Sequence, residues 1–170
     1  VVHINTLKGK GYAPAEQNKE EWHWHMPFDI ATGESLSKDE EPDFADASLE
    51  YLLRKMDEDK SVVAITAGTP TVMGFTADMR AKAGKQFVDV GIAEEEAATM
   101  TTGLAKAGAK PIWVVFSTFF QRTYDQLSHD MALNNQAGTI LVYSASVNGM
   151  NDESHLGFFD IPFLAHIPNF

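Results

Sequence analysis

The chain has 170 residues, 44% of them hydrophobic and 22% charged, which is the balance of a globular domain and not of a disordered segment. Its net charge of -11 at pH 7 repels phosphate backbones, so we expect no nucleic-acid partner. No apolar run reaches the roughly 18 residues of a membrane-spanning helix, so we expect no membrane partner. The absence of cysteine excludes disulfides and thiolate metal sites and fits a cytoplasmic protein.

The two ends of the chain are both apolar. Val1 to Leu7 is rich in β-branched residues and predicts a strand, which a glycine-punctuated loop follows at 8–12. The chain begins in this run without a methionine and ends at Phe170 just after another apolar stretch, so we expect a piece of a longer protein. The acidic segment 31–42 has no periodicity and predicts an exposed linker.

A regular alternation of elements follows this linker. The patterns predict helices at 44–57, 76–84, 93–107 and 118–134, and strands at 62–67, 86–90, 111–116 and 139–144. This order predicts an α/β fold, with a mainly parallel sheet covered by helices on both faces. Ligands bind such sheets at the carboxyl ends of the strands. Four loops are therefore candidates for a site, namely 68–75, 91–96, 117–122 and 146–157.

The second of these loops leads into three consecutive carboxylates, Glu94, Glu95 and Glu96, in the first turn of a predicted helix. Carboxylates at a helix N-terminus can simply complement the helix dipole. Alternatively, one side chain points inward while its neighbours point outward, because adjacent helix positions differ by about 100°. A buried carboxyl group of this kind can donate a proton. Spacing alone leaves both interpretations open.

The third loop places aromatic residues, among them Phe119, and the cation Arg122 at another strand end. A capping Thr118 and core phenylalanines would explain the same pattern. In the fourth loop, an isolated histidine such as His155 is commonly a surface residue. His23 and His25 alternate with tryptophans but lack a third ligand, so no metal site is predicted.

Four segments carry a more specific signal together than any of them carries alone. They are 3–16 (HINTLKGKGYAPAE), 87–95 (FVDVGIAEE), 116–126 (FSTFFQRTYDQ), and His155 with 157–162 (GFFDIP). In this order they resemble the 1-deoxy-D-xylulose-5-phosphate synthases, a transketolase-like family of thiamine-diphosphate (ThDP) enzymes. The resemblance covers nearly the whole chain.

The resemblance implies a homodimeric transferase of isoprenoid biosynthesis that binds ThDP and Mg²⁺. Members condense pyruvate with glyceraldehyde 3-phosphate and release CO₂. Residues 1–33 would be the end of a first, diphosphate-binding domain and 34–43 a linker, while 44–170 would be a C-terminally incomplete pyrimidine-binding domain. The Gly-Asp-Gly…Asn motif that chelates Mg²⁺ is absent from the sequence, so we expect the Mg²⁺ ligands outside this chain.

The resemblance also implies roles for individual residues. Glu94 matches the glutamate that faces the pyrimidine N1′ and favours the tautomer that deprotonates C2 of the cofactor. Further cofactor contacts are implied for Tyr12, Phe116, Phe119 and Arg122. His23 and His155 match histidines that face the substrate as proton-transfer groups. Asn151 stands where the family has a substrate-facing aspartate.

Several positions depart from the family pattern. Tyr143 and Ser144 replace an Asp-Arg pair whose arginine helps to hold the phosphate of the aldehyde, and a serine cannot supply that planar cation. Phe116 replaces a tyrosine, and Glu96 replaces a histidine. Because the cofactor residues are kept while substrate residues differ, we predict a divergent branch with a different acceptor. A standard synthase with relocated phosphate contacts, a transketolase-like enzyme with another donor or acceptor, and a non-catalytic paralogue remain open.

Overall fold

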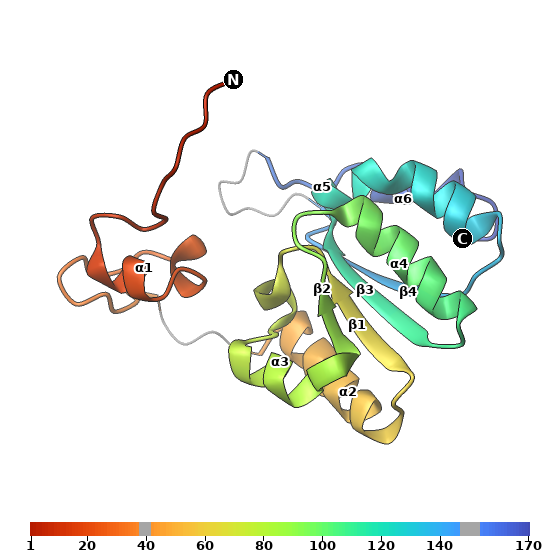
Figure 1. The fold of residues 1–170 in the computed structure, drawn as a ribbon, viewed down its shortest axis with the longest axis horizontal. Coiled ribbons are helices and arrows are strands. Elements are labelled where there is room, and N and C mark those ends of the chain that lie inside the picture. Colours follow the sequence, from red (N-terminus) through yellow and green to blue (C-terminus); the bar gives the residue numbers. More distant parts are fainter. Residues whose placement is uncertain (38–41, 147–153) are drawn as a thin grey trace. The chain divides into compact units, whose positions relative to one another are not determined.

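The computed structural model describes residues 1–37, 42–146 and 154–170. It consists of two compact units, Val1–Asp43 and Phe44–Phe170 (Figure 1). Within the described residues, every helix is too short or too polar to cross a lipid bilayer.

The larger unit is built on a four-stranded parallel sheet in the order β2-β1-β3-β4. The strands are β1 (Val62–Thr66), β2 (Phe87–Asp89), β3 (Lys110–Phe116) and β4 (Thr139–Tyr143). The register pairs Thr66 with Asp89 and Phe116 with Tyr143, so the carboxyl ends of the strands lie along one edge. The α/β prediction of a mainly parallel sheet is confirmed.

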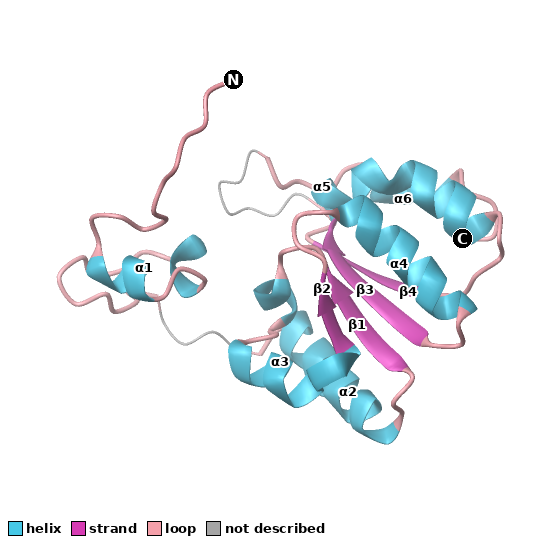
Figure 2. Cartoon of the chain, in the orientation of Figure 1, coloured by secondary structure: helices cyan, strands magenta, loops and turns pink. Residues whose placement is uncertain are grey.

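Helices pack on both faces of this sheet (Figure 2). One face is covered by α2 (Phe44–Glu58) and α3 (Ala77–Ala83). The other is covered by α4 (Glu94–Lys106), the π-helix η5 (Gln126–Ala132) and α6 (Asp160–Ala165). The fully buried ring of Trp113 lies in the second of these cores.

Local signals account for the helices that the sequence predicted. In α2, the residues Leu49, Leu52 and Met56 are buried, at the spacing of one helix face. Thr76 caps α3 by accepting a hydrogen bond from the Met79 N–H, and Gly84 ends it with a φ of 56°. Beyond α3 lies the short 3₁₀ helix η3 (Gly84–Gln86), which leads into β2.

The predicted helix at 118–134 is wrong as a single regular helix. The structure has α5 (Ser117–Phe120), the 3₁₀ turn η4 (Gln121–Thr123) and the π-helix η5 in its place. The hydroxyl of Thr123 donates to the carbonyl of Phe120 at 2.7 Å, a local bond that competes with regular helix geometry. Apolar periodicity alone does not reveal such a change of pitch, since it reports only which face is buried.

The predicted strand at Val1–Leu7 is also wrong, because this segment is irregular and exposed in the structure. A strand needs a partner for its backbone groups. Among the described residues of the smaller unit, β-type pairing is limited to an isolated bridge between Phe28 and Ser35. Helix α6, in contrast, was not predicted, since Pro162 and the flanking aromatic residues masked its helical pattern; proline is tolerated in a first turn.

The smaller unit is held by aromatic contacts between short elements, α1 (Ala13–Gln17) and η1 (Glu21–His23). Trp22 stacks on His25 at 4.5 Å between ring centroids and meets Tyr12 edge-on at 5.0 Å. A third neighbour, Phe28, lies 4.7 Å from Trp22.

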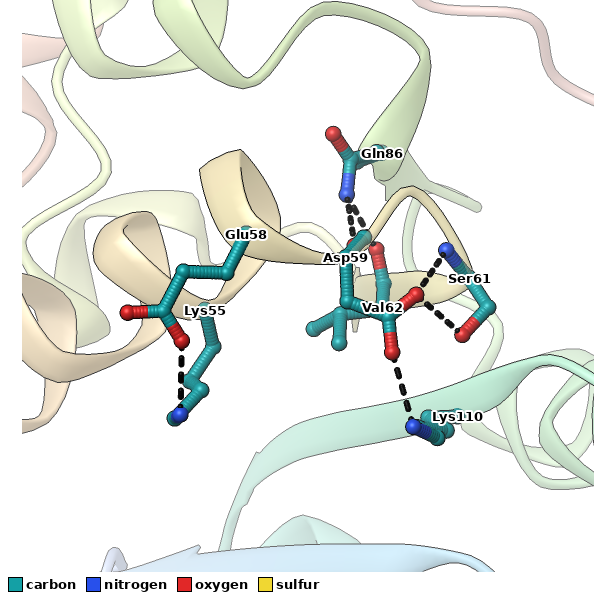
Figure 3. Close-up of polar contacts among 7 residues, drawn as sticks. All are labelled: Lys55, Glu58, Asp59, Ser61, Val62, Gln86 and Lys110. Carbon is teal, nitrogen blue, oxygen red and sulfur yellow. Dashed lines mark hydrogen bonds and ion pairs between the residues drawn. The ribbon is translucent and has the colours of Figure 1, made fainter.

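At the amino ends of the strands in the larger unit, Asp59 ties the turn between α2 and β1 to β3 (Figure 3). Its carboxylate accepts from Lys110 Nζ at 2.7 Å and from the N–H and hydroxyl of Ser61 at 2.8 and 2.7 Å. Gln86 closes the same turn by donating to the carbonyls of Asp59 and Val62. The bond from Lys110, together with those from Ser61, holds the pKa of Asp59 well below its usual range.

We expect Asp59→Asn to lower the thermal midpoint near neutral pH. A carboxylate whose pKa is lower in the folded state stabilises that state above its unfolded pKa of about 3.9. This contribution is lost as the pH falls toward the folded pKa. The difference between wild type and variant should therefore shrink below about pH 4. Thermal unfolding across this range tests it. Glu58→Gln, which removes exposed surface pairs with Lys55 and Arg54, is a control of smaller effect. A pH-independent difference would contradict the assignment.

Candidate functional site at the carboxyl edge of the sheet

One of the three consecutive carboxylates is buried. Glu94 is the first residue of α4, and its side chain is only 3% exposed, whereas Glu95 and Glu96 are exposed. The turn of the helix separates them, since each residue rotates by about 100°. The structure therefore has the inward-pointing arrangement that the sequence left open.

Glu94 forms an ion pair with Arg122 at the carboxyl edge of the sheet. Arg122 Nη1 lies 3.1 Å from Glu94 Oε2 and donates a hydrogen bond to it. The two residues follow β2 and β3, which are separated by β1 in the sheet. The Arg122 side chain is 53% exposed, so the pair connects a buried anion to a cation at the surface. A buried charge needs such a partner, and the N-terminus of α4 favours the same negative charge.

Three rings form a wall at the ends of β3 and β4. Phe119 meets Phe116 edge-on at 5.5 Å between ring centroids, and His155 meets Phe119 edge-on at 5.2 Å. The third pair, Phe116 and His155, is 6.1 Å apart. His155 Nδ1 also lies 2.7 Å from the hydroxyl of Ser154.

The segment that carries His155 is fastened to the end of β3. The hydroxyl of Thr118 donates to the carbonyl of Ser154 at 3.1 Å. Gly157 packs so closely that a Cβ added there would lie 2.5 Å from the Ser117 hydroxyl and 2.7 Å from Ala145 Cα. Only glycine fits this approach. Its N–H donates to the carbonyl of Ser146 at 3.1 Å.

Three residues at this edge were not predicted as site residues, namely Asp89, Ser154 and Gly157. Asp89 accepts hydrogen bonds from the N–H groups of Gly68 and Gly91, which belong to two different candidate loops. An aspartate two residues before a glycine is a recognisable local signal for such a bond. Nothing in the sequence, however, indicates the partner at Gly68.

The remaining predicted site residues are Tyr12 and His23, which belong to the smaller unit, and Asn151. In the smaller unit, the Tyr12 hydroxyl is buried, and a Cβ added to Gly33 would lie 3.3 Å from it. His23 is exposed and contacts Lys8 Nζ through Nδ1. Asn151 lies outside the described residues. In the described parts of the chain, no group of three or more histidine, aspartate or glutamate side chains is placed to hold a metal ion.

A parallel sheet with helices on both faces is a doubly wound α/β domain. In this class ligands bind at the carboxyl ends of the strands, where this chain has a buried carboxylate and aromatic rings. Residues 40–170 match the family model described as "Transketolase, pyrimidine binding domain". The chain belongs to this family.

Curated relatives match almost the entire chain. It is 40% identical over 169 residues to a 1-deoxy-D-xylulose-5-phosphate synthase of Halothermothrix orenii, covering 99% of this chain and 26% of the relative. The synthase of a Nitratiruptor species is 43% identical over 169 residues, covering 99% of this chain and 28% of the relative. The chain therefore spans about a quarter of the length of these relatives.

A solved structure shares the fold. It is described as "Split gene transketolase, inactive beta4 tetramer" and superimposes with a TM-score of 0.58 at 21% identity. The match covers 72% of this chain and 39% of the other. At this level of identity, the likeness shows the fold alone.

Removing Arg122 should destabilise the protein through Glu94. Arg122→Ala leaves the buried carboxylate without this partner and should cost about 1–3 kcal/mol, toward the lower end because Arg122 is half exposed. In a Glu94→Gln background the same substitution should cost clearly less. Urea titrations of the two single variants and the double variant give the coupling. The exposed Glu95→Gln is the matched control, and a coupling to Arg122 equal to that of Glu94 would contradict the pairing.

Proposed function

We propose that this protein is a ThDP-dependent enzyme that forms carbon–carbon bonds, a 1-deoxy-D-xylulose-5-phosphate synthase that joins pyruvate to glyceraldehyde 3-phosphate and releases CO₂. The observation that carries the proposal is the buried carboxylate of Glu94, placed at the strand-to-helix junction of a pyrimidine-binding domain. The synthase relatives at about 40% identity support the choice of reaction.

The residues at the carboxyl edge suit the pyrimidine ring of ThDP. This ring is flat, aromatic and carries a ring nitrogen that pairs with a carboxyl group. Phe116 and Phe119 offer aromatic surface, and Glu94 offers a carboxyl group shielded from water. When bound, ThDP supplies the carbanion and the electron sink for decarboxylation.

The proposed roles of the residues follow from their surroundings. Glu94 would hold a proton at the pyrimidine N1′, and its burial keeps water from competing for that hydrogen bond. Arg122 would hold the second carboxyl oxygen and so orient the group. His155 would move a proton at the substrate, with its ring oriented by the contact of Nδ1 with Ser154. Asn151 would face the same substrate.

Within the smaller unit, residues 1–33 are proposed to be the end of the diphosphate-binding domain and 34–43 a linker. The relatives match across this part of the chain, whereas the pyrimidine-binding model begins at residue 40, which supports a separate domain. Tyr12 would contact the cofactor and His23 the substrate from this domain. We propose that Mg²⁺ is held by residues outside this chain, and that the enzyme is a homodimer in the cytoplasm.

A specific observation favours a second candidate, a transketolase-like enzyme with another acceptor. Ser144 directly follows β4 at the carboxyl edge, at the position where the resemblance expects a phosphate-binding arginine. Its φ is 52°, which turns the chain away from the strand direction. A serine here makes no bidentate contact with a phosphate. Compared with an enzyme that has arginine at this position, the affinity for a phosphorylated aldehyde would therefore fall more than that for a plain aldehyde.

Glu94→Gln in the full-length protein should slow exchange of the C2 proton of bound ThDP by about 10²–10⁴-fold, because the amide has no acidic proton. Glu95→Gln and Glu96→Gln should each cost much less, since both side chains are exposed. Deuterium exchange followed by NMR after acid quench measures the rates. Equal losses in all three variants would identify the cluster as a helix-terminal charge patch. A wild-type protein without exchange would favour the non-catalytic paralogue.

Ser144→Arg should improve kcat/KM for a phosphorylated aldehyde over its plain counterpart. One charge-assisted hydrogen bond contributes about 1.5–3 kcal/mol, or about 10- to 100-fold. Ser144→Gln is the control, because it places a longer polar side chain at the same strained backbone position but carries no charge. A preference that stays unchanged in Ser144→Arg would show that the phosphate is held elsewhere, as in a standard synthase with relocated contacts.

A further inference from the structure

We infer that Asp89 is a positioning residue that locks two loops of the carboxyl edge together and thereby sets the position of Glu94. Its consequence for catalysis rests on the function proposed above, whereas its effect on the loops does not. Asp89 is the last residue of β2, five positions before Glu94.

A single carboxylate oxygen makes the connection. Asp89 Oδ1 accepts the N–H of Gly68 at 2.8 Å and the N–H of Gly91 at 2.9 Å. Gly68 follows β1, whereas Gly91 follows β2, so the oxygen joins the loops of neighbouring strands. Hydrogen bonds to an ionised acceptor are about twice as strong as neutral ones. The carboxylate of Asp89 therefore stabilises the backbone of both loops.

The two loops are also in close steric contact. Gly68 and Gly91 have φ values of 74° and 75°, which favour glycine. A Cβ added to Gly68 would lie 3.1 Å from Ile92 Cγ1 and 3.3 Å from the Ile92 nitrogen. The loop after β1 thus rests directly on the residues that lead into α4.

Backbone hydrogen bonds hold the short segment between β2 and α4. The Val90 N–H donates to the Thr66 carbonyl at 3.0 Å, and the Ala93 N–H donates to the Gly91 carbonyl at 2.8 Å. Gly91 is therefore connected within three residues to Glu94, and Asp89 fixes Gly91. Displacing a reacting group by about 1 Å can cost about 100-fold in rate. Loss of the Asp89 bonds would act on Glu94 through this short segment.

The experiment uses Asp89→Ala and Asp89→Asn in the full-length protein. First, amide hydrogen exchange without ThDP reports the loops directly. Asp89→Ala should speed exchange at Gly68 and Gly91 by about tenfold or more, and Asp89→Asn by less, because asparagine keeps an acceptor but not the charge. Asp59→Asn is the matched control, since that carboxylate also accepts a backbone N–H but at the opposite edge of the sheet. It should speed exchange at Ser61 and leave Gly68 and Gly91 unchanged.

The second measurement is C2 proton exchange at saturating ThDP. Asp89→Ala should lower the rate by about tenfold or more, with partial recovery in Asp89→Asn and no change in Asp59→Asn. Unchanged amide exchange at Gly68 and Gly91 in Asp89→Ala, or an unchanged C2 rate, would overturn the inference. If Glu94→Gln slows C2 exchange while Asp89→Ala does not, only the inference fails. If Glu94→Gln has no effect, the proposed function fails, while the amide exchange still tests the link between the loops.

Discussion

The burial of one carboxylate constrains the whole carboxyl edge of this domain. An ionised group that is 3% exposed is stable only where the protein replaces the water it has lost. For Glu94, the guanidinium of Arg122 donates a hydrogen bond, and the dipole at the N-terminus of α4 favours the negative charge. Both depend on where strands end, because α4 follows β2 and Arg122 follows β3. The register of the parallel sheet thus decides whether the anion can be buried.

The two edges of the sheet use polar contacts for different purposes. At the amino edge, polar contacts tie a turn to its neighbours through Asp59, Lys110 and Gln86 (Figure 3). At the carboxyl edge, comparable contacts join loops that hold the candidate site residues, through Asp89, through the Glu94–Arg122 pair and through Thr118 with Ser154. Substitutions at the first edge should act on stability, while those at the second should also act on the site.

The parts of the fold that local chemistry determines could be predicted from the sequence. Thr76 and Gly84 bound α3 through a cap and a positive φ, and both signals are visible in the sequence. Helix rotation predicts only that the three carboxylates point in different directions, and the structure is needed to show that Glu94 is the buried one. The Glu94–Arg122 contact could not be predicted, because it depends on the strand order and on the 3₁₀ turn at η4. For the same reason Val1–Leu7 was mistaken for a strand, since β-propensity says nothing about whether a partner exists.

The unequal exposure of the Glu94–Arg122 pair affects what the site can do. A fully buried pair is costly to separate, because each charge would be left in a medium of low polarity. Here Arg122 is 53% exposed, so water stabilises its charge when the side chain moves away from Glu94. The cost of separation then falls mainly on the carboxyl group, which can recover it from another hydrogen-bonding partner. A ring nitrogen presented to Glu94 would be such a partner. Under the proposed function, the half-exposed arginine would keep the buried carboxylate stable without a ligand and leave it available to one.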